Sequence, residues 1–368
     1  MKDKLSSIDY KFLLSELSLL INSRLGKISQ QDSTWLLEFY VTSKGKKFLK
    51  ISLGKYLCLT SQKLEPSESN FCQYLRKHLA NARLKNITQI DSERIIKLEL
   101  ETKESSYNLL FEILSKGNII LCSEDNIIIK ALENQSFKDR QIRQGIKYVY
   151  PKSSYNLFSK DFTQFSKTIK ESSRDSIVKT LAIEIGLGGT YAEEICLLSG
   201  INKTKRELSE QDIKKLFENL NKLLASKTKA SIIYSEYSPN EAIDVVPINL
   251  KLYESYTKKD FPSFNEAADL YFNQGIAKKP SRYEKEINKL KKIIEQGQVK
   301  ILELEEQELL ERGRAEAIYN NYQLIDEILT EIKKARHNYS WKEIKEKLKE
   351  HKIIKDVNER EGKVEIEL

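Results

Sequence analysis

The order of hydrophobic and polar residues predicts one helix followed by a run of antiparallel strands. Residues 7–22 place Leu13, Leu17 and Leu20 on one face, which predicts an amphipathic helix. From residue 24 onward hydrophobic residues alternate with polar ones, and polar or glycine-bearing turns separate the short runs. Short strands without long helices between them are typical of an antiparallel meander or sandwich, not of a parallel doubly wound sheet. The expected strands are 35–41, 49–53, 56–59, 95–100, 108–114, 118–122 and 127–132.

A short basic helix lies between the two groups of strands, at the start of residues 69–100. Phe71, Leu75 and Leu79 recur at helical spacing, so one face of this helix is expected to be buried. A buried stripe that backs a cationic surface suits a phosphate platform, but a solvated amphipathic helix explains the same pattern. Both interpretations stay open for this stretch alone. The cationic residues are Arg76, Lys77 and Arg83.

A charged corner, residues 91–94, precedes the strand 95–100. It reads Asp-Ser-Glu-Arg, so that Glu93 stands directly beside Arg94. Asp91 and Glu93 are the one carboxylate pair to consider for acid–base chemistry, and the adjacent arginine favours an ion pair instead. The sequence contains no glycine-rich phosphate loop, serine-nucleophile elbow or His-Glu-x-x-His helix. These residues favour a binding protein over an enzyme.

Residues 139–151 interleave basic and aromatic side chains as the chain leaves the second group of strands. Such a segment can follow a nucleic-acid backbone, because the cations meet phosphates and the rings stack on bases. A surface strap without a ligand explains the pattern equally well. The side chains concerned are Arg140, Arg143, Lys147, Tyr148 and Tyr150.

From about residue 174 the hydrophobic period becomes helical. Gly186 and Gly188 alternate with apolar residues between two of the expected helices, a pattern typical of a helix-hairpin-helix. Glycines let the backbone turn tightly, and the N–H groups that open the next helix can bind an anion. A plain helix–helix corner, or a hairpin that contacts only protein, explains the same residues. The expected elements are helices at 177–185, 191–199 and 212–224, then strands at 230–234 and 242–253.

A long helix is expected from Ser281 onward, with Ile287, Leu290, Ile294, Ile301 and Leu304 in heptad register. Gly297 falls on the hydrophobic seam and Gly313 interrupts the pattern again, so a soft point or bend is expected. The charged outer faces favour a coiled-coil arm, although a long helix packed on its own domain is the alternative. Capping boxes are expected at Ser263 with Glu266, Ser281 with Glu284 and Ser340 with Glu343, and closing strands at 353–357 and 364–368.

Composition and charge agree with a multi-domain protein that suits a polyanionic partner but does not require one. The 368 residues are enough for about two to four domains. The excess of 62 basic over 54 acidic residues gives a net charge of +8. Since the histidines are scattered, neither a metal site nor a cofactor is expected. Cys58, Cys72, Cys122 and Cys196 lie in or beside apolar runs without a Cys-x-x-Cys pair, which predicts buried free thiols in a reducing compartment.

The N-terminus has no apolar signal region, and no apolar run approaches the length of a membrane span. The protein is therefore expected to be cytoplasmic, without a membrane partner.

Several segments together resemble the NFACT family, the RqcH and NEMF type of ribosome quality-control factor. No single match is decisive, but their order and spacing cover nearly the whole chain. The matching segments are 69–83 (SNFCQYLRKHLANAR), 89–99 (QIDSERIIKLE), 117–121 (GNIIL), 140–151, 186–201, 264–272 (FNEAADLYF), 320–329 (NNYQLIDEIL) and 362–368.

The resemblance implies an α+β chain with an antiparallel β-sandwich-like N-terminal domain, similar in shape to the formamidopyrimidine-DNA glycosylases. A helix-hairpin-helix domain, a coiled-coil arm and a small α/β middle domain follow. The corresponding ranges are 1–173, 174–279, 280–336 and 337–368.

The resemblance also implies two partners, the large ribosomal subunit and tRNA. The family binds a large subunit that still carries a stalled peptidyl-tRNA, and it recruits tRNA so that a C-terminal tail is added to the nascent chain. It implies no catalytic residues. The tRNA contacts are expected at Glu93, Arg94, Arg76, Lys77 and Arg83, and the nucleic-acid hairpin at Gly186 and Gly188.

The sequence departs from the family pattern at the charged corner and at the C-terminus. The family usually carries Asp-Arg where this chain has Glu93 and Arg94, so the acid reaches one methylene further. The family also continues into a second coiled-coil strand and a C-terminal RNA-binding domain, and the sequence is therefore expected to be a fragment. It begins Met-Lys-Asp and lacks the catalytic Pro-Glu of the glycosylases. A DNA-binding glycosylase-like enzyme and a coiled-coil interaction scaffold are the alternative functions.

Overall fold

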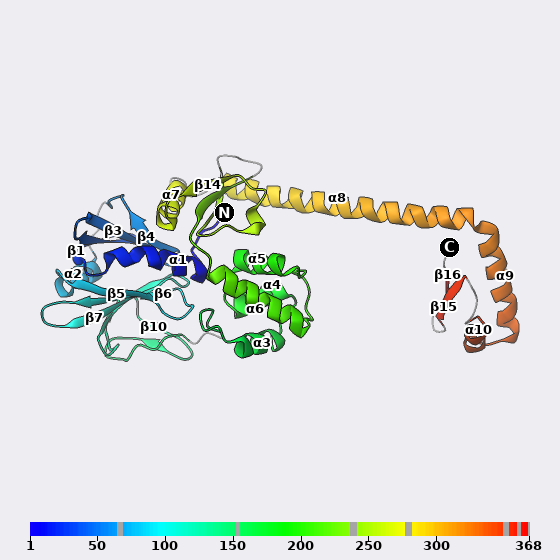
Figure 1. Cartoon of the computed structure of the whole chain (residues 1–368), viewed down its shortest axis with the longest axis horizontal. Helices are drawn as coiled ribbons and strands as arrows, with labels where there is room; N and C mark the ends of the chain where they lie inside the picture. Colours follow the sequence, from blue (N-terminus) through cyan, green and yellow to red (C-terminus); the bar gives the residue numbers. More distant parts are fainter. Residues whose placement is uncertain are drawn as a thin grey trace. The chain divides into compact units, whose positions relative to one another are not determined.

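The chain folds into two compact units, Met1–Ala277 and Lys278–Leu368, in a computed structural model (Figure 1). The structure describes residues 1–64, 69–151, 155–235, 241–276, 282–348, 353–358 and 362–366. A large antiparallel sheet and groups of helices follow one another along the chain, which confirms the α+β prediction. Within these ranges, no helix combines the length and the apolar character needed to cross a membrane.

The first unit is built on a nine-stranded sheet with the order β4-β3-β2-β1-β5-β6-β7-β8-β9. Neighbouring strands are antiparallel, as the alternating pattern predicted. The two halves of the sheet meet at β1 and β5 through a single residue pair, Arg24 with Arg83. The strands are β1 Arg24–Gln31, β2 Thr34–Val41, β3 Gly45–Ser52, β4 Tyr56–Thr60, β5 Arg83–Gln89, β6 Ile95–Glu101, β7 Ser106–Glu112, β8 Asn118–Ser123 and β9 Ile128–Ala131.

Both halves of this sheet enclose one hydrophobic core, so the sandwich-like arrangement is made by one sheet and not by two separate ones. Trp35 and Phe39 of the first half and Phe111 of the second are fully buried in the same cluster. Helix α1 (Ser7–Leu17) contributes Leu13 and Leu17 and runs between the two halves (Figure 1). Helix α2 (Asn70–His78) covers β1 with the apolar face that the sequence predicted.

The turn between β3 and β4 contacts the turn between β7 and β8. Gly54 and Gly117 occupy these turns with φ of +72° and +80°. A Cβ on Gly54 would lie 2.3 Å from the Ser115 carbonyl oxygen, and a Cβ on Gly117 would lie 2.6 Å from the Gly54 nitrogen. Only glycine allows the two halves of the sheet to approach this closely.

A helical part follows within the same unit. It comprises α3 (Phe162–Lys170), the single turn α4 (Ile177–Lys179), α5 (Gly189–Ser199) and α6 (Glu210–Leu224). The expected helix 177–185 is wrong in detail, because α4 passes into a π-turn at Thr180–Glu184. The hydrophobic pattern of the sequence did not predict α3. These helices share a second core, to which α1 contributes Ile8 and Phe12 from its other face.

A three-stranded sheet of order β13-β12-β14 and helix α7 (Phe264–Ile276) complete the unit. The strands are β12 Ala230–Tyr234, β13 Ala242–Val246 and β14 Lys258–Phe261. The expected strand 242–253 is too long, because residues Lys251–Tyr253 form a 3-10 turn. Ile232 faces the first core and Ile233 the second, so this sheet belongs to both.

One carboxylate, from α1, and one serine fix the start of α7. The Glu16 carboxylate accepts hydrogen bonds from the N–H groups of Phe264 and Asn265 at 2.8 Å each. The Ser263 hydroxyl accepts the N–H of Glu266 at 3.1 Å, which is half of the predicted capping box.

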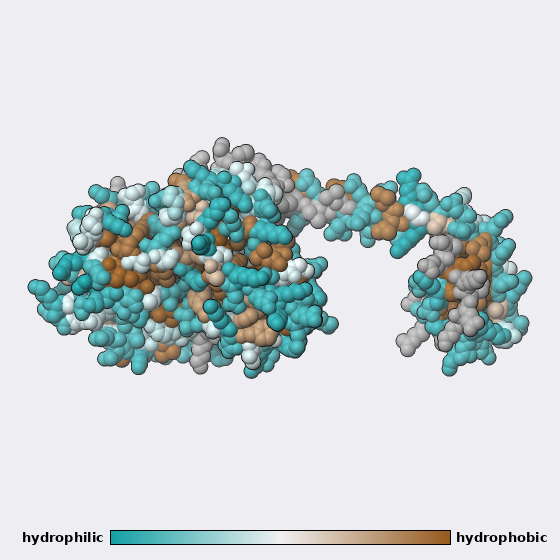
Figure 2. Space-filling model, in the orientation of Figure 1, coloured by the Kyte–Doolittle hydropathy of each residue, from teal (hydrophilic) through white to brown (hydrophobic). Residues whose placement is uncertain are grey.

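The second unit comprises α8 (Arg282–Asn320), α9 (Tyr322–Asn338), α10 (Trp341–Lys347) and the strand pair β15 (Ile354–Asn358) and β16 (Lys363–Ile366). Helix α8 continues through Gly297 and Gly313, so the predicted bend is wrong, and the helix ends at Asn320 instead. Leu290, Ile294, Ile301 and Leu304 of its heptad register are exposed, and Figure 2 shows hydrophobic residues among hydrophilic ones along the helix. The predicted capping box of Ser340 and Glu343 is confirmed, whereas Ser281 lies outside the described residues.

Candidate functional site

A cleft of about 550 Å³ opens on the first unit where three segments meet. One is the N-terminal segment before α1, the second is the charged corner between β5 and β6, and the third is the glycine-bearing turn before α5. The structure therefore brings Glu93 and Arg94 to the same cleft as Gly186 and Gly188, which the sequence had treated as separate features. The segments are residues 2–7, 92–94 and 182–191, with Leu114 and Tyr155 also lining the cleft.

The charged corner is held in place by side chains from α1 and β5. The Gln89 amide donates to the Ser7 carbonyl and hydroxyl oxygens at 3.1 and 2.9 Å, and to the Glu93 carbonyl oxygen at 2.9 Å. The Ser7 hydroxyl donates to the Ser92 carbonyl oxygen at 2.5 Å. These bonds fix the corner to the first turn of α1.

Glu93 and Arg94 are both half-buried, and their side chains form no hydrogen bond or ion pair with the described part of the chain. The ion pair expected at this corner is therefore not formed. Burial raises the pKa of Glu93, and the nearby Arg94 opposes that shift only in part. The Asp91 carboxylate instead accepts a hydrogen bond from the Asn156 amide at 3.0 Å. Two ionisable groups without protein partners beside a cleft are typical of a ligand site.

The turn before α5 places the N-terminus of that helix at the cleft. Gly186 and Gly188 have φ of +86° and +75°, which explains why glycine is needed at both positions. The N–H groups of Leu187 and Gly188 donate back into the π-turn, to the carbonyl oxygens of Leu181 and Ala182, at 3.1 Å each. Helix α5 then begins at Gly189 without a side-chain cap. A helix N-terminus of this kind favours an anion.

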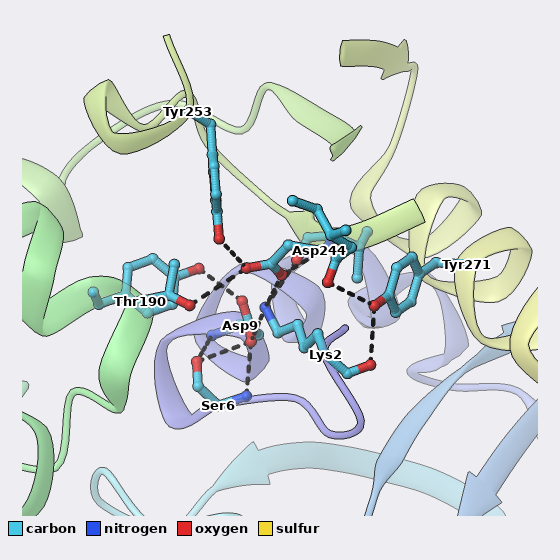
Figure 3. A network of polar contacts seen from close by, with 10 residues as sticks. Lys2, Ser6, Asp9, Thr190, Asp244, Tyr253 and Tyr271 are labelled. Carbon is cyan, nitrogen blue, oxygen red and sulfur yellow. Dashed lines mark hydrogen bonds and ion pairs between the residues drawn. The ribbon is translucent and has the colours of Figure 1, made fainter. Parts of the chain in front are cut away.

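Beneath the cleft lies a buried ionic network that the sequence did not predict (Figure 3). The Lys2 ammonium group lies 2.9 Å from Asp9 Oδ2 and 3.1 Å from Asp244 Oδ1, and it donates to the Val245 carbonyl oxygen at 2.8 Å. Burial alone would lower the pKa of Lys2, but the carboxylates of Asp244 and Asp9 outweigh it and the pKa is raised. The signal in the sequence was the spacing of Ser6 and Asp9, which form a reciprocal cap on α1.

Hydroxyl groups extend this network into the walls of the cleft. The Tyr191 hydroxyl donates to Asp9 Oδ1 at 2.7 Å, and the Thr190 hydroxyl donates to Asp244 Oδ2 at 3.3 Å. The Tyr253 hydroxyl donates to the same Asp244 oxygen at 2.7 Å. The first turn of α5 is thus tied to α1 and to β13.

The other basic residues proposed for tRNA contact do not line this cleft. The Arg76 side chain is half-buried, and its Nε donates to the Ile28 carbonyl oxygen at 2.6 Å. Lys77 is exposed on α2. Arg83 is exposed at the first residue of β5, the end of that strand opposite to the charged corner. The structure therefore separates these residues from Glu93 and Arg94.

The basic and aromatic segment 139–151 is divided between core and surface. Arg140 donates to the buried Glu112 carboxylate at 2.5 Å, and the Tyr148 hydroxyl donates to the same oxygen at 2.5 Å. Burial, with the adjacent Glu112 carboxylate adding to it, raises the pKa of Tyr148. The nucleic-acid interpretation is wrong for Arg140 and Tyr148, whereas Arg143 and Lys147 are exposed.

The four cysteines are buried free thiols, as the sequence predicted. Burial raises the pKa of Cys122 to about 12 and that of Cys196 to about 11. Thiols that stay protonated near neutral pH are poor nucleophiles.

Comparison with solved structures supports the fold of the first unit. The fibrinogen binding protein of Staphylococcus aureus superimposes with a TM-score of 0.59 at 20% identity, over 73% of this chain and 98% of that one. The N-terminal part of the fibronectin/fibrinogen-binding protein of Streptococcus suis gives a TM-score of 0.57 at 19% identity, over 74% and 100%.

Comparison with known sequences identifies the family. The archaeal Rqc2 homolog aRqcH of Methanocaldococcus jannaschii is 34% identical over the whole of this chain and 58% of its own length. The human ribosome quality control complex subunit NEMF is 23% identical over 94% of this chain and 35% of its own length. The chain thus spans about half, or less, of these relatives. The model of the NFACT N-terminal and middle domains matches residues 6–368, and the chain therefore belongs to the NFACT family.

Proposed function

We propose that this chain acts in ribosome quality control, as the names of its relatives state for those proteins. In this proposal it binds a large ribosomal subunit that carries a stalled peptidyl-tRNA and recruits tRNA for C-terminal tailing of the nascent chain, in the cytoplasm. The observation that carries the proposal is the convergence of Glu93, Arg94 and the turn at Gly186 and Gly188 on one cleft.

The chemistry of this cleft suits a nucleic-acid backbone. The Arg94 guanidinium has no partner in the described part of the chain, and the exposed Lys4 lines the same cleft from the N-terminal segment. The uncapped N-terminus of α5 adds backbone N–H donors and a partial positive charge. We assign the segment 177–199 to a helix-hairpin-helix that contacts a phosphate, and Glu93 to a neighbouring hydroxyl or amine donor of the RNA.

Binding, not catalysis, is the role that we propose for this site. A glycosylase that acts through a Schiff base needs an unprotonated amine as nucleophile. The Lys2 amine near the N-terminus has a raised pKa and forms ion pairs with Asp9 and Asp244, so it is held in the protonated form. Incubation with damaged DNA duplexes is expected to release no base and to cleave no strand.

The salt dependence of tRNA binding tests the proposal. Wild-type protein is expected to bind tRNA with an affinity that falls steeply as salt rises. Arg94→Ala is expected to weaken binding and to lower the slope of log affinity against log salt by about one, since one phosphate contact is lost. Arg206→Ala is the matched control, because this arginine is exposed and does not line the cleft.

The same two variants can be tested on ribosomes. Co-sedimentation with large subunits, followed by sequencing of the bound RNA, is expected to recover tRNA with wild type and Arg206→Ala but much less with Arg94→Ala. A wild-type protein that binds neither tRNA nor large subunits at low salt would refute the proposal.

The exposed hydrophobic stripe of α8 supports a second role as a coiled-coil arm. Leu290, Ile294, Ile301 and Leu304 are 51 to 60% exposed and lie in heptad register. A stripe of this kind needs a partner helix, which we propose is supplied by another protein chain. Deletion of residues 282–320 is expected to abolish that association, and protein contacts that survive the deletion would count against a scaffold role.

A further inference from the structure

The buried network beneath the cleft contains two carboxylates and one ammonium group. Asp9 is fully buried and Asp244 is 4% exposed, and both lie within 3.1 Å of Lys2 Nζ. Figure 3 shows Lys2 between the two carboxylates. Two carboxylates that are both shielded from solvent repel each other strongly unless a cation lies between them.

Each carboxylate binds a different segment of the cleft lining. Asp9 accepts hydrogen bonds from the Ser6 N–H and hydroxyl at 2.7 and 2.9 Å, which fixes the N-terminal segment. Asp244 accepts the Thr190 hydroxyl, which fixes the first turn of α5. Lys2 is the group that joins the two carboxylates, and the Tyr191 hydroxyl adds a second link to Asp9.

Lys2 has no donor left for a ligand, although it lines the cleft. An ammonium group has three N–H donors. Those of Lys2 are directed to Asp9, to Asp244 and to the Val245 carbonyl oxygen. Its side chain is only 12% exposed. Direct contact with a phosphate would break one of these interactions.

We propose that Lys2 is a positioning residue of the cleft. It offsets one of the two negative charges of Asp9 and Asp244 and bridges both carboxylates, and so holds the N-terminal segment and the first turn of α5 at the separation that lets Arg94 and the α5 N-terminus bind one RNA backbone. This inference rests on the proposed function, since it concerns the same cleft.

Charge balance provides the test. Lys2→Met removes the ammonium group and leaves two carboxylates together. The double variant Lys2→Met/Asp244→Asn restores the net charge of the network, and the link from Tyr191 to Asp9 remains. Lys44→Met is the matched control, because Lys44 is exposed in the turn between β2 and β3 and does not line the cleft.

Lys2→Met is expected to weaken tRNA binding by about tenfold, which corresponds to about 1.4 kcal/mol. The double variant is expected to return to within about threefold of wild type, and Lys44→Met to bind as wild type does. Hydrogen exchange of the Ser6, Leu187, Gly188 and Ala192 amides, which donate hydrogen bonds in these two segments, is expected to accelerate in Lys2→Met and to slow again in the double variant.

Two results would overturn the proposal. A folded double variant that binds tRNA about tenfold more weakly than wild type, while its Ser6 and Ala192 amides exchange as slowly as in wild type, would show that Lys2 acts on the RNA directly and not by positioning. This comparison with wild type stands even if Lys2→Met alone does not fold. Unchanged affinity in a folded Lys2→Met would show that the cleft does not depend on Lys2. Binding by Arg94→Ala, measured in parallel, distinguishes failure of the positioning role from failure of the proposed function. If it weakens binding while Lys2→Met does not, only the positioning role fails, whereas no tRNA binding by wild type would refute the proposed function.

Discussion

Glu93 and Arg94 are adjacent in sequence but form no ion pair, and this leaves both groups available to a ligand. Glu93 is half-buried between β5 and β6, and burial raises its pKa. The ionised form is therefore disfavoured in the folded protein relative to the unfolded chain. The Glu93 carboxylate therefore lowers the stability of the folded protein. Such a cost is common for residues that serve a binding site.

Glu93→Gln is expected to raise the free energy of unfolding at pH 7 by about 0.5 kcal/mol, because it removes this half-buried charge. The folded-state pKa is raised, so wild-type protein recovers stability as pH falls through that value and Glu93 becomes protonated. The difference between the two proteins is thus expected to shrink toward pH 4. Urea unfolding of both at pH 7 and pH 4 measures it, and a difference independent of pH would contradict the burial argument.

Arg140 shows the limit of residue-level prediction from sequence. In the chain it stands among basic and aromatic residues, which suggested a nucleic-acid contact. In the fold its side chain is 6% exposed and paired with Glu112, a residue 28 positions away on β7. An ion pair between residues far apart in the chain leaves no periodic signal in the sequence. The pair of Lys2 and Asp244 could not be predicted for the same reason.

Glu112→Gln is expected to lower the free energy of unfolding by about 3–5 kcal/mol, because Arg140 is left as an unpaired buried charge. Glu101→Gln removes the acid of a half-exposed pair with Lys85 and is expected to cost at most about 1 kcal/mol. Thermal unfolding of the two variants gives the comparison. Equal effects would mean that Arg140 is better solvated than its burial indicates.

At the scale of elements, strands were predicted well and irregular helices were not. The hydrophobic pattern gave β6, β8 and β12 almost to the residue, β6 by partial alternation and β8 and β12 as short apolar runs that are buried on both faces. It gave no sign of the π-turn Thr180–Glu184, which depends on the tertiary fit of the glycine-bearing turn after it. Gly297 was expected to bend α8, yet an isolated glycine costs a helix only about 1 kcal/mol, and α8 is continuous there.

The contact between the β3–β4 and β7–β8 turns is expected to depend on glycine. Gly54→Ala would place a Cβ 2.3 Å from the Ser115 carbonyl oxygen and would also strain a left-handed residue. The loss of stability is expected to be about 3–5 kcal/mol, the sum of strain and overpacking.

Gly45→Ala is the control for this contact. Gly45 has a similar φ of +70°, but nothing lies within 4 Å of its added Cβ. It is expected to cost about 1 kcal/mol, the price of the left-handed conformation alone. Chemical unfolding of both variants separates close approach from backbone strain, and equal losses would rule out the contact between turns.

At the scale of the whole molecule, α1 connects the two cores of the first unit. Leu13 and Leu17 pack in the sheet core, whereas Ile8 and Phe12 pack with the helices. The helical pattern of residues 7–22 predicted a wide apolar stripe. It did not predict that α1 packs in two cores, because periodicity shows which face of a helix is apolar but not which elements pack against it. The same helix begins at the cleft, so the cores and the candidate site share one element.

The two units are expected to unfold separately. The first has a large core around Trp35, whereas the buried residues of the second-unit cluster are Ile332, Ile354 and Val357, with Trp341 packed against them. A small core buries little apolar surface and is marginally stable. Fluorescence of Trp341 in a Trp35→Phe variant is therefore expected to change at lower urea than that of Trp35 in a Trp341→Phe variant. Because the sequence contains two tryptophans, each variant reports on one unit alone. Coincident transitions would instead require strong coupling between the units, since separate cores of such different size have no reason to unfold together.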